Sequence, residues 1–306
     1  MTAAIAATTT VPAAFALAPW MDSQLACVEQ ALGRFLPADA PAGLGEAMRY
    51  AVLDGGKRLR PLLVLAAAEA VGGQHQAALR AACAVELIHA YSLVHDDMPC
   101  MDNDVLRRGK PTVHVQFGQA QALLAGDALQ ALAFELLTPE DGVPAAMQAQ
   151  LCRLLARAAG AEGMAGGQAI DLAHVGQRLT EDELRHMHRL KTGALLRASV
   201  EMGAACGAPS EAARAALARY GAAIGLAFQV VDDVLDVTQD STTLGKTAGK
   251  DAASDKPTYV SLMGLEGARA YAATLLDEGL AQLDASGLSD TRALAALAGM
   301  VVHRTH

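Results

Sequence analysis

The chain has few aromatic residues: Phe, Trp and Tyr together make up 4% of its 306 residues. Strands favour aromatic and β-branched residues, whereas the hydrophobic 52% of this sequence is dominated by alanine and leucine, which favour helix. It has no alternating apolar and polar run that ends in an Asn-Gly or Asp-Gly turn, the usual sign of a β-hairpin. The composition therefore predicts an all-α fold.

The sequence also lacks an excess of positive charge. Its formal net charge is −9, which argues against nucleic acid or an anionic membrane as a partner held by bulk attraction. An anionic substrate must then be held by local basic groups or by metal ions.

Cysteine pairs and long apolar runs are missing as well. The five cysteines are scattered and include no Cys-x-x-Cys pair, so we expect reduced thiols rather than a disulfide framework. No uninterrupted apolar run approaches the roughly 20 residues of a membrane span. The opening stretch "MTAAIAATTTVPAAFALAPW" lacks arginine and a basic start, so it does not match a secretion or transit signal. We expect a cytoplasmic protein without stable membrane insertion, and a loosely ordered extension over residues 1–20.

Long helical patterns fill residues 21–306, which we interpret as one domain. A helix is expected after Asp22, and Thr180-x-x-Glu183 has the spacing of a capping box that opens another. The segment 211–237 is long, alanine-rich and free of proline. Two polar stretches interrupt the pattern, at 53–61 and 239–257. The second is lysine-rich and contains glycine, so it predicts a lid that closes over a substrate.

An acidic cluster lies near the end of the 211–237 segment, in "VVDDVLD". Because each helical residue advances about 100°, Asp232 and Asp236 lie on one face, with Asp233 beside them. Carboxylates crowded on an apolar helix repel one another and raise one another's pKa values. Hard oxygen ligands suit Mg²⁺, so the cluster predicts a metal site.

A second acidic cluster, "HDDMPCMDND", has a different spacing. Cys100 occupies the position one turn after Asp96, and the next aspartate is Asp102. Pro99 disfavours helix at the preceding residue, so the helix should end near Met98 and the following turn can bring Asp102 back beside Asp96. Magnesium takes one or two carboxylates and completes its shell with phosphate oxygens and water. The two clusters together predict a diphosphate or triphosphate that bridges them.

Basic residues near these clusters are candidates for binding phosphate. His89 lies about two helical turns before Asp96 and shares its face, so it is a further candidate donor. The basic candidates are Lys57, Arg58, Arg60, Arg107, Arg108, Lys191 with Thr192, Lys246 and Lys256.

The motifs that carry these residues form a recognisable series. In chain order they are "GGKRLRP", "LIHAYSLVHDDMPCMDNDVLRRGKPTVH", "LAGDALQALAF", "GMAGGQAIDL", "LKTGALL", "FQVVDDVLDV" and "TLGKTAGKDAASDKPTY". From about residue 20 onward the chain resembles the trans-isoprenyl diphosphate synthases, and most closely their bacterial farnesyl diphosphate synthase branch. The tail "VVHRTH" matches no strong motif.

The resemblance implies an all-α bundle around a central cavity, usually in a homodimer, with three Mg²⁺ ions between two aspartate-rich motifs. It implies condensation of isopentenyl diphosphate with dimethylallyl or geranyl diphosphate to give farnesyl diphosphate. The metal ligands implied are Asp96, Asp102, Asp232 and Asp236. The catalytic residues implied are Asp96, Asp97, Asp102, Lys191, Asp232 and Asp233. The residues matching the isopentenyl diphosphate site are Lys57, Arg60, His89 and Arg108. Those matching the allylic diphosphate site are Arg107, Lys191, Thr192, Gln229, Lys246 and Lys256.

Product length follows from the same resemblance. Tyr91 lies five residues before Asp96, about 7.5 Å lower along the helix, with Ser92 beside it. An aromatic residue here, together with the inserted pair Pro99-Cys100, accompanies C15 products in the enzymes that the chain resembles. A geranylgeranyl diphosphate synthase remains an alternative. So does a non-catalytic subunit of a heteromeric synthase, although such subunits usually lose aspartates. A terpene cyclase is disfavoured because its second metal motif has a different pattern.

Overall fold

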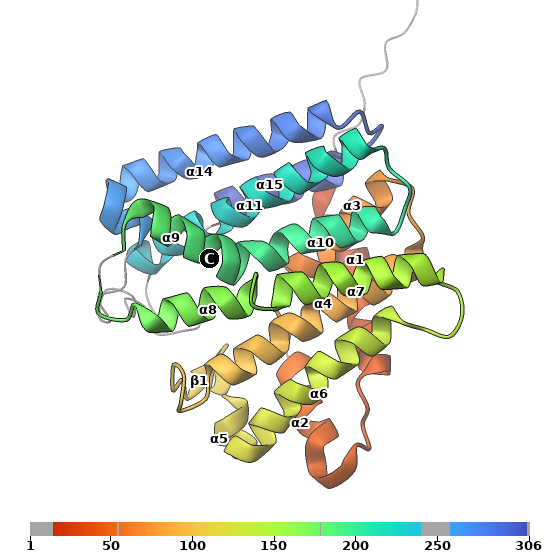
Figure 1. The fold of residues 1–306 in the computed structure, drawn as a ribbon, viewed down its shortest axis with the longest axis vertical. Helices are drawn as coiled ribbons and strands as arrows, with labels where there is room; N and C mark the ends of the chain where they lie inside the picture. Colours follow the sequence, from red (N-terminus) through yellow and green to blue (C-terminus); the bar gives the residue numbers. More distant parts are fainter. Residues whose placement is uncertain (1–14, 54, 178, 240–257, 305–306) are drawn as a thin grey trace, which may run out of the picture.

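A computed structural model describes residues 15–53, 55–177, 179–239 and 258–304. Helices dominate these residues, as expected, and they run in a broad bundle (Figure 1). The first half contains α1 (Leu17–Phe35), α2 (Leu44–Val52), α3 (Leu59–Ala70), α4 (His75–Asp96), α5 (Val113–Phe117) and α6 (Gln119–Leu137). The second half contains α7 (Ala145–Ala159), α8 (Met164–Ala173), α9 (Glu181–His188), α10 (Ala194–Ala205), α11 (Glu211–Thr238), α14 (Tyr259–Ala285) and α15 (Arg292–His303).

Helix α4 lies inside the bundle. It packs against α3, α6 and α10, and most of its residues between Ala77 and Val94 are buried. Helix α10 in turn packs against α3 and α11, and α11 runs beside α14 (Figure 1). The acidic clusters therefore lie at the C-terminal ends of two packed helices, α4 and α11, whose positions the core determines.

Three helix boundaries differ from the sequence-based expectation. Helix α1 begins at Leu17, so residues 17–20 are helical and Asp22 does not cap the helix. The apolar residues Trp20 and Met21 explain this earlier start, because they pack against the α3–α11–α15 core. Helix α4 ends at Asp96 rather than near Met98. The pattern after Thr180 is not one helix, because a π-helical turn, η2 (Arg189–Gly193), separates α9 from α10.

One local prediction is confirmed, whereas a helix cap and a short strand pair were not predicted. Thr180 and Glu183 form a complete capping box at the start of α9. Ser210 caps α11 by accepting from the backbone of Ala213. A two-stranded ribbon pairs β1 (Leu106–Arg107) with β2 (Lys110–Pro111), and it is too short to produce an alternating pattern.

By length and composition alone, α4 and α6 could each cross a membrane, contrary to the expectation from uninterrupted apolar runs. Alanine-rich helices with few charges can reach the mean hydropathy of a membrane-spanning helix without a continuous run of large apolar residues. In α4, 72% of the most apolar window is buried inside the fold, as in a core helix, compared with 39% in α6.

Candidate active site

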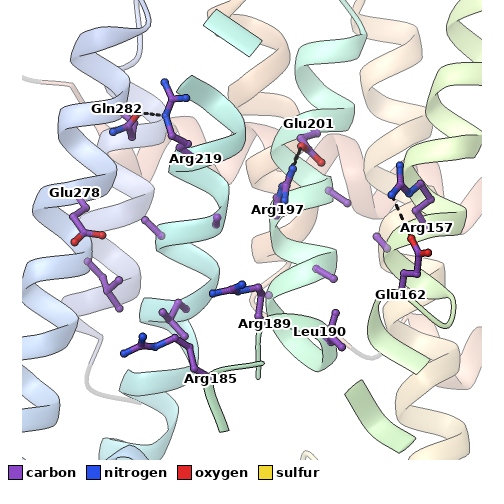
Figure 2. Close-up of a pocket in the computed structure, with 18 of the residues that line it drawn as sticks. Arg157, Glu162, Arg185, Arg189, Leu190, Arg197, Glu201, Arg219, Glu278 and Gln282 are labelled. Carbon is purple, nitrogen blue, oxygen red and sulfur yellow. Dashed lines mark hydrogen bonds and ion pairs between the residues drawn. The ribbon is translucent and has the colours of Figure 1, made fainter. Parts of the chain in front are cut away.

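The largest cavity lies outside the predicted site. It has a volume of about 910 Å³ and lies among α7, α10, α11 and α14. Figure 2 shows that some of its arginine side chains are paired: Arg197 with Glu201 within α10, Arg157 with Glu162, and Arg219 of α11 with Gln282 of α14. Among the described residues, none of those predicted for phosphate or metal binding lines it.

A second cavity, of about 400 Å³, brings the predicted residues together. It lies between α4, α8 and the η2 turn. The predicted residues that line it are Arg60, His89, Tyr91, Ser92, Asp96, Lys191 and Thr192. Met101, Met164, Leu172 and His95 line it as well. This cavity thus combines three sets of predicted residues: those for isopentenyl diphosphate, those for the allylic diphosphate and those for chain length.

The first acidic cluster folds back as predicted. After α4 ends, the backbone N–H of Asp102 donates to the carbonyl of Asp96 at 2.8 Å, which places the two residues side by side. Asn103 adopts a left-handed conformation with φ 51°, which asparagine tolerates in turns. Burial raises the pKa of Asp96 to about 6, with Asp102 and Asp97 adding to the rise and Lys191 and Arg107 opposing it. A cation at Asp96 would relieve this cost.

Asp97 has a different environment from Asp96. It is buried, and its carboxylate accepts two hydrogen bonds from Arg107 Nε and one from Nη2, the last at 2.6 Å. Because Arg107 belongs to β1, this ion pair attaches the ribbon to the end of α4. Both residues were predicted to act at the site, and in the structure each has the other as its partner.

The basic residues Arg58 and Arg60, at the start of α3, have different environments. Arg58 is buried, with pairs to Glu29 and Glu86 at 2.7 Å each, so it serves the core. Arg60 instead lines the cavity, and burial lowers its pKa to about 10 although Glu86 opposes the shift. Arg108, from the ribbon, donates to the carbonyl of Gly55. Arg108 therefore reaches the loop that leads into α3, whose second residue is Arg60.

His89 is uncharged at neutral pH in this setting. Burial lowers its pKa well below the usual value, and Arg60, Arg108 and Arg107 add to the effect. A neutral imidazole has one N–H donor and one acceptor. His89 can therefore donate a single hydrogen bond to an anion, without adding charge.

Lys191 is held by α8, which no sequence-based assignment included. Its Nζ donates to Asp171 Oδ2 at 2.5 Å. A side-chain carbon at Gly167 would lie 2.1 Å from the backbone nitrogen of Lys191, so only glycine permits this close approach of α8 to η2. The "GGQAID" letters of the fourth motif carried this signal: the glycine permits the contact and the aspartate follows one turn later.

The second acidic cluster connects to the cavity through a chain of hydrogen bonds. Thr192 donates to Gln229 Oε1 at 3.1 Å, and Gln229 donates to Asp233 Oδ1 at 3.0 Å. The other oxygen of Asp233 accepts the backbone N–H of Tyr259, the first residue of α14, at 2.8 Å. Asp233 is buried and binds protein groups, whereas Asp232 is partly exposed.

Arg304, in the tail that matched no motif, contacts this cluster. Its Nη2 donates to the carbonyl of Phe228 at 2.9 Å and lies 3.3 Å from Asp232 Oδ1. Its guanidinium carbon lies 4.0 Å from the centre of the Phe228 ring. Burial lowers the pKa of Lys57, Arg304 adds to the decrease and Asp232 opposes it, so all three groups are electrostatic neighbours.

Replacing Arg304 by glutamine should lower the free energy of unfolding by about 1–3 kcal/mol, since one buried hydrogen bond, one ion pair and a ring contact are lost together. Lysine should not restore it, because an ammonium cannot stack on Phe228 while bonding the carbonyl. Chemical denaturation measures the difference. Arg292→Gln is the matched control: Arg292 pairs with Asp290 at the surface, so its loss should leave stability unchanged. Full stability of Arg304→Lys would contradict the stacked geometry.

Lys246 and Lys256, and the predicted lid, lie outside the described residues. The described part of the chain has no group of three acidic, histidine or cysteine side chains that meet at one point. Magnesium does not require such a group, because it takes one or two carboxylates and fills its shell with phosphate and water oxygens. Asp96 beside Asp102, with its raised pKa, fits this chemistry. Asp232 is partly exposed, and a metal ion there would compete with Arg304 for its carboxylate.

Comparison with known proteins identifies the family. The polyprenyl synthetase family profile matches residues 41–295, and the chain belongs to this family. It is 48% identical to the farnesyl diphosphate synthase of Escherichia coli, over 91% of this chain and 97% of that protein. It is 46% identical to a chloroplastic heterodimeric geranylgeranyl pyrophosphate synthase large subunit of Arabidopsis thaliana, over 96% of this chain and 81% of that one. The crystal structure of an FPP/GFPP synthase from Zymomonas mobilis has a TM-score of 0.84 and 42% identity, covering 94% of this chain and 98% of that one.

Proposed function

We propose that this chain is a magnesium-dependent farnesyl diphosphate synthase. It joins isopentenyl diphosphate head-to-tail to dimethylallyl or geranyl diphosphate and releases diphosphate. One observation carries the proposal: the cavity beside Asp96 is lined both by basic groups for two diphosphates and by apolar side chains. Relatives named as farnesyl diphosphate synthases, such as that of E. coli, support it.

Two sets of residues divide the substrates between them. Arg60, His89, Arg108 and Lys57 would hold isopentenyl diphosphate. Arg108 contacts Gly55 in the loop that carries Lys57 and leads into α3, where Arg60 lies. A neutral His89 would donate one hydrogen bond and leave the charge balance to the arginines. Lys191 would hold the allylic diphosphate, with Arg107, Thr192, Gln229, Lys246 and Lys256 as further contacts.

Metal ions would be held by Asp96, Asp102, Asp232 and Asp236, with three ions expected. Bound Mg²⁺ would neutralise diphosphate charge as a Lewis acid while the carbon–oxygen bond breaks. Asp97 would position the site through Arg107, and Asp233 through Gln229 and α14.

The apolar lining would protect the reaction. An allylic cation is quenched by water, so its site must exclude solvent. Met101, Met164, Ala165, Ala169 and Leu172 line the cavity beside the charged groups and present no hydroxyl or amine. The double bond of isopentenyl diphosphate is then the nucleophile available to attack the cation. The resulting cation would lose a proton to the released diphosphate, and this loss forms the new double bond.

Tyr91 should limit product length. It lines the cavity on α4 and packs edge-on to His95, with ring centres 5.7 Å apart. We propose that the growing hydrocarbon stops at this ring, with Ser92 beside it. Tyr91→Ala should shift the product from C15 to C20 and longer, because the ring that lies about 7.5 Å along the helix from Asp96 would no longer stop the growing hydrocarbon. Chromatography of dephosphorylated products measures the shift, with Tyr50→Ala as a control for losing a tyrosine outside this cavity. An unchanged C15 product would exclude Tyr91 as the floor.

The decisive experiment supplies purified protein with labelled isopentenyl diphosphate and one allylic primer at a time. Farnesyl diphosphate as the main product from geranyl diphosphate supports the proposal. Geranylgeranyl diphosphate as the main product would support the alternative, a geranylgeranyl diphosphate synthase, which is the activity in the name of the Arabidopsis relative. The absence of any product with every primer would support a non-catalytic subunit.

We also propose a cytoplasmic homodimer. Helix α6 carries Leu123 and Leu124 with 47% and 51% exposure, an apolar face that a second copy would cover. The cysteines are free, and burial raises the pKa of Cys83 and Cys206 to about 12, which suits a reducing compartment. Sedimentation of Leu124→Glu against the natural chain would test the interface.

A further inference from the structure

Gln168 is a buried amide without a protein partner. It lies on α8, is 9% exposed, and neither its Oε1 nor its Nε2 hydrogen-bonds any described residue. Native proteins pair nearly all such groups, because an unpaired buried amide forfeits the hydrogen bonds it made with water. An apolar side chain of similar size would avoid that cost. A glutamine here therefore needs an explanation.

The surroundings of Gln168 point to a ligand. Its neighbours along α8, namely Met164, Ala165, Ala169 and Leu172, line the cavity with apolar groups. From the other side, Asp96, Lys191 and Thr192 line the same cavity. Gln168 is thus the single polar group that α8 contributes to this lining among the described residues.

The position of Gln168 relative to these groups is rigid. The preceding residue, Gly167, contacts the backbone of Lys191, and Asp171, one turn later, binds the Lys191 ammonium at 2.5 Å. Two contacts on either side of Gln168 therefore hold α8 against the η2 turn. A rigid amide next to Lys191 is preorganised for whatever Lys191 binds.

We propose that Gln168 is a substrate-contacting catalytic residue whose amide N–H donates to the diphosphate of the allylic substrate. This inference rests on the proposed function. The hydrogen bond strengthens as the carbon–oxygen bond breaks, because negative charge then accumulates on the departing diphosphate. Gln168 forms no covalent bond and transfers no proton. Its carbonyl oxygen, with no hydrogen to donate, faces the cationic end of the hydrocarbon.

The test compares Gln168→Met with Gln148→Met. Gln148 is also a glutamine, but it lies outside the cavity and has protein partners. Its amide donates to the carbonyls of Pro139 and Val143 at 2.8 and 2.9 Å. For Gln168→Met we expect kcat with geranyl diphosphate to fall about 10- to 100-fold, the worth of a hydrogen bond to a charged group. The melting temperature of the ligand-free protein should stay equal or rise. Gln148→Met should show the opposite pattern, with a lower melting temperature and unchanged kcat.

A second readout does not depend on turnover. Calorimetric binding of the thiolo analogue of geranyl diphosphate, with Mg²⁺ present, should weaken for both Gln168→Met and Gln168→Glu, since neither retains the N–H donor. Unchanged affinity and kcat in Gln168→Met would overturn the proposal. So would a lower melting temperature, because it would mean that the amide has a partner inside the protein. A natural chain without synthase activity would count against the proposed function itself, and this role would fall with it.

Discussion

Asp96→Asn should lower kcat by about three orders of magnitude or more, because it removes a charge that must hold a metal ion against a departing diphosphate. The fold should survive. Burial raises the pKa of Asp96 to about 6, above its value in an unfolded chain, so ionising this carboxyl costs stability that is recovered only at low pH. A neutral asparagine avoids that cost, and the metal-free protein should gain about 1–3 kcal/mol of stability at pH 7–8.

Two further aspartate variants serve as controls for this prediction. Asp277→Asn removes an exposed carboxylate on α14 and should change neither rate nor stability. Asp97→Asn breaks the buried pair with Arg107 and should lower stability, unlike Asp96→Asn. Steady-state rates and denaturant unfolding measure both quantities. Near-normal turnover by Asp96→Asn would show that this carboxylate is not a metal ligand.

Removing divalent cations with excess chelator should abolish turnover completely. Without a metal, the carboxylates of Asp96, Asp102 and Asp232 would face a diphosphate, and the lysines and arginines assigned to the two diphosphates would offset only part of the repulsion. Added Mg²⁺ should restore the full rate. Unfolding curves recorded with and without chelator serve as the control, since an unchanged curve shows that the loss is not denaturation. Turnover that persists in chelator would contradict the role of both acidic clusters.

Local chemistry made part of the site predictable. Pro99 ends a helix wherever the fold places it, so the return of Asp102 to Asp96 followed from a few adjacent letters. The capping box at Thr180 followed in the same way. Such features depend on contacts within one turn of the chain, which residue order alone describes.

The division of labour within each aspartate pair was not predictable. Adjacent helical residues lie about 100° apart, so two neighbours cannot share one environment. Asp97 turns to Arg107 and Asp233 turns to the start of α14, while Asp96 lines the cavity and Asp232 stays partly exposed. The helical period requires the two aspartates of each pair to point in different directions. Which of the two is buried depends on the segments that pack against the helix.

Long-range partners were also hidden from the sequence. Arg58 and Arg60 stand two positions apart in one basic motif, yet Arg58 pairs with Glu86 in the core and Arg60 faces the cavity. Arg304 reaches Asp232 across 72 positions. Gln168 acquires meaning only from its burial beside Lys191. In each case the residue type is common, and its role depends on packing that brings distant segments together.

In the proposed function, one cavity couples the loss of diphosphate from an allylic substrate to the capture of the resulting allylic cation by isopentenyl diphosphate. This coupling is tested most directly by measuring released inorganic diphosphate and labelled prenyl product in the same reaction with geranyl diphosphate. The account predicts one diphosphate released for each labelled unit incorporated, with neither signal when isopentenyl diphosphate is omitted. Diphosphate released at a comparable rate from geranyl diphosphate alone would contradict it, because the cavity would then serve hydrolysis or cyclisation instead of condensation.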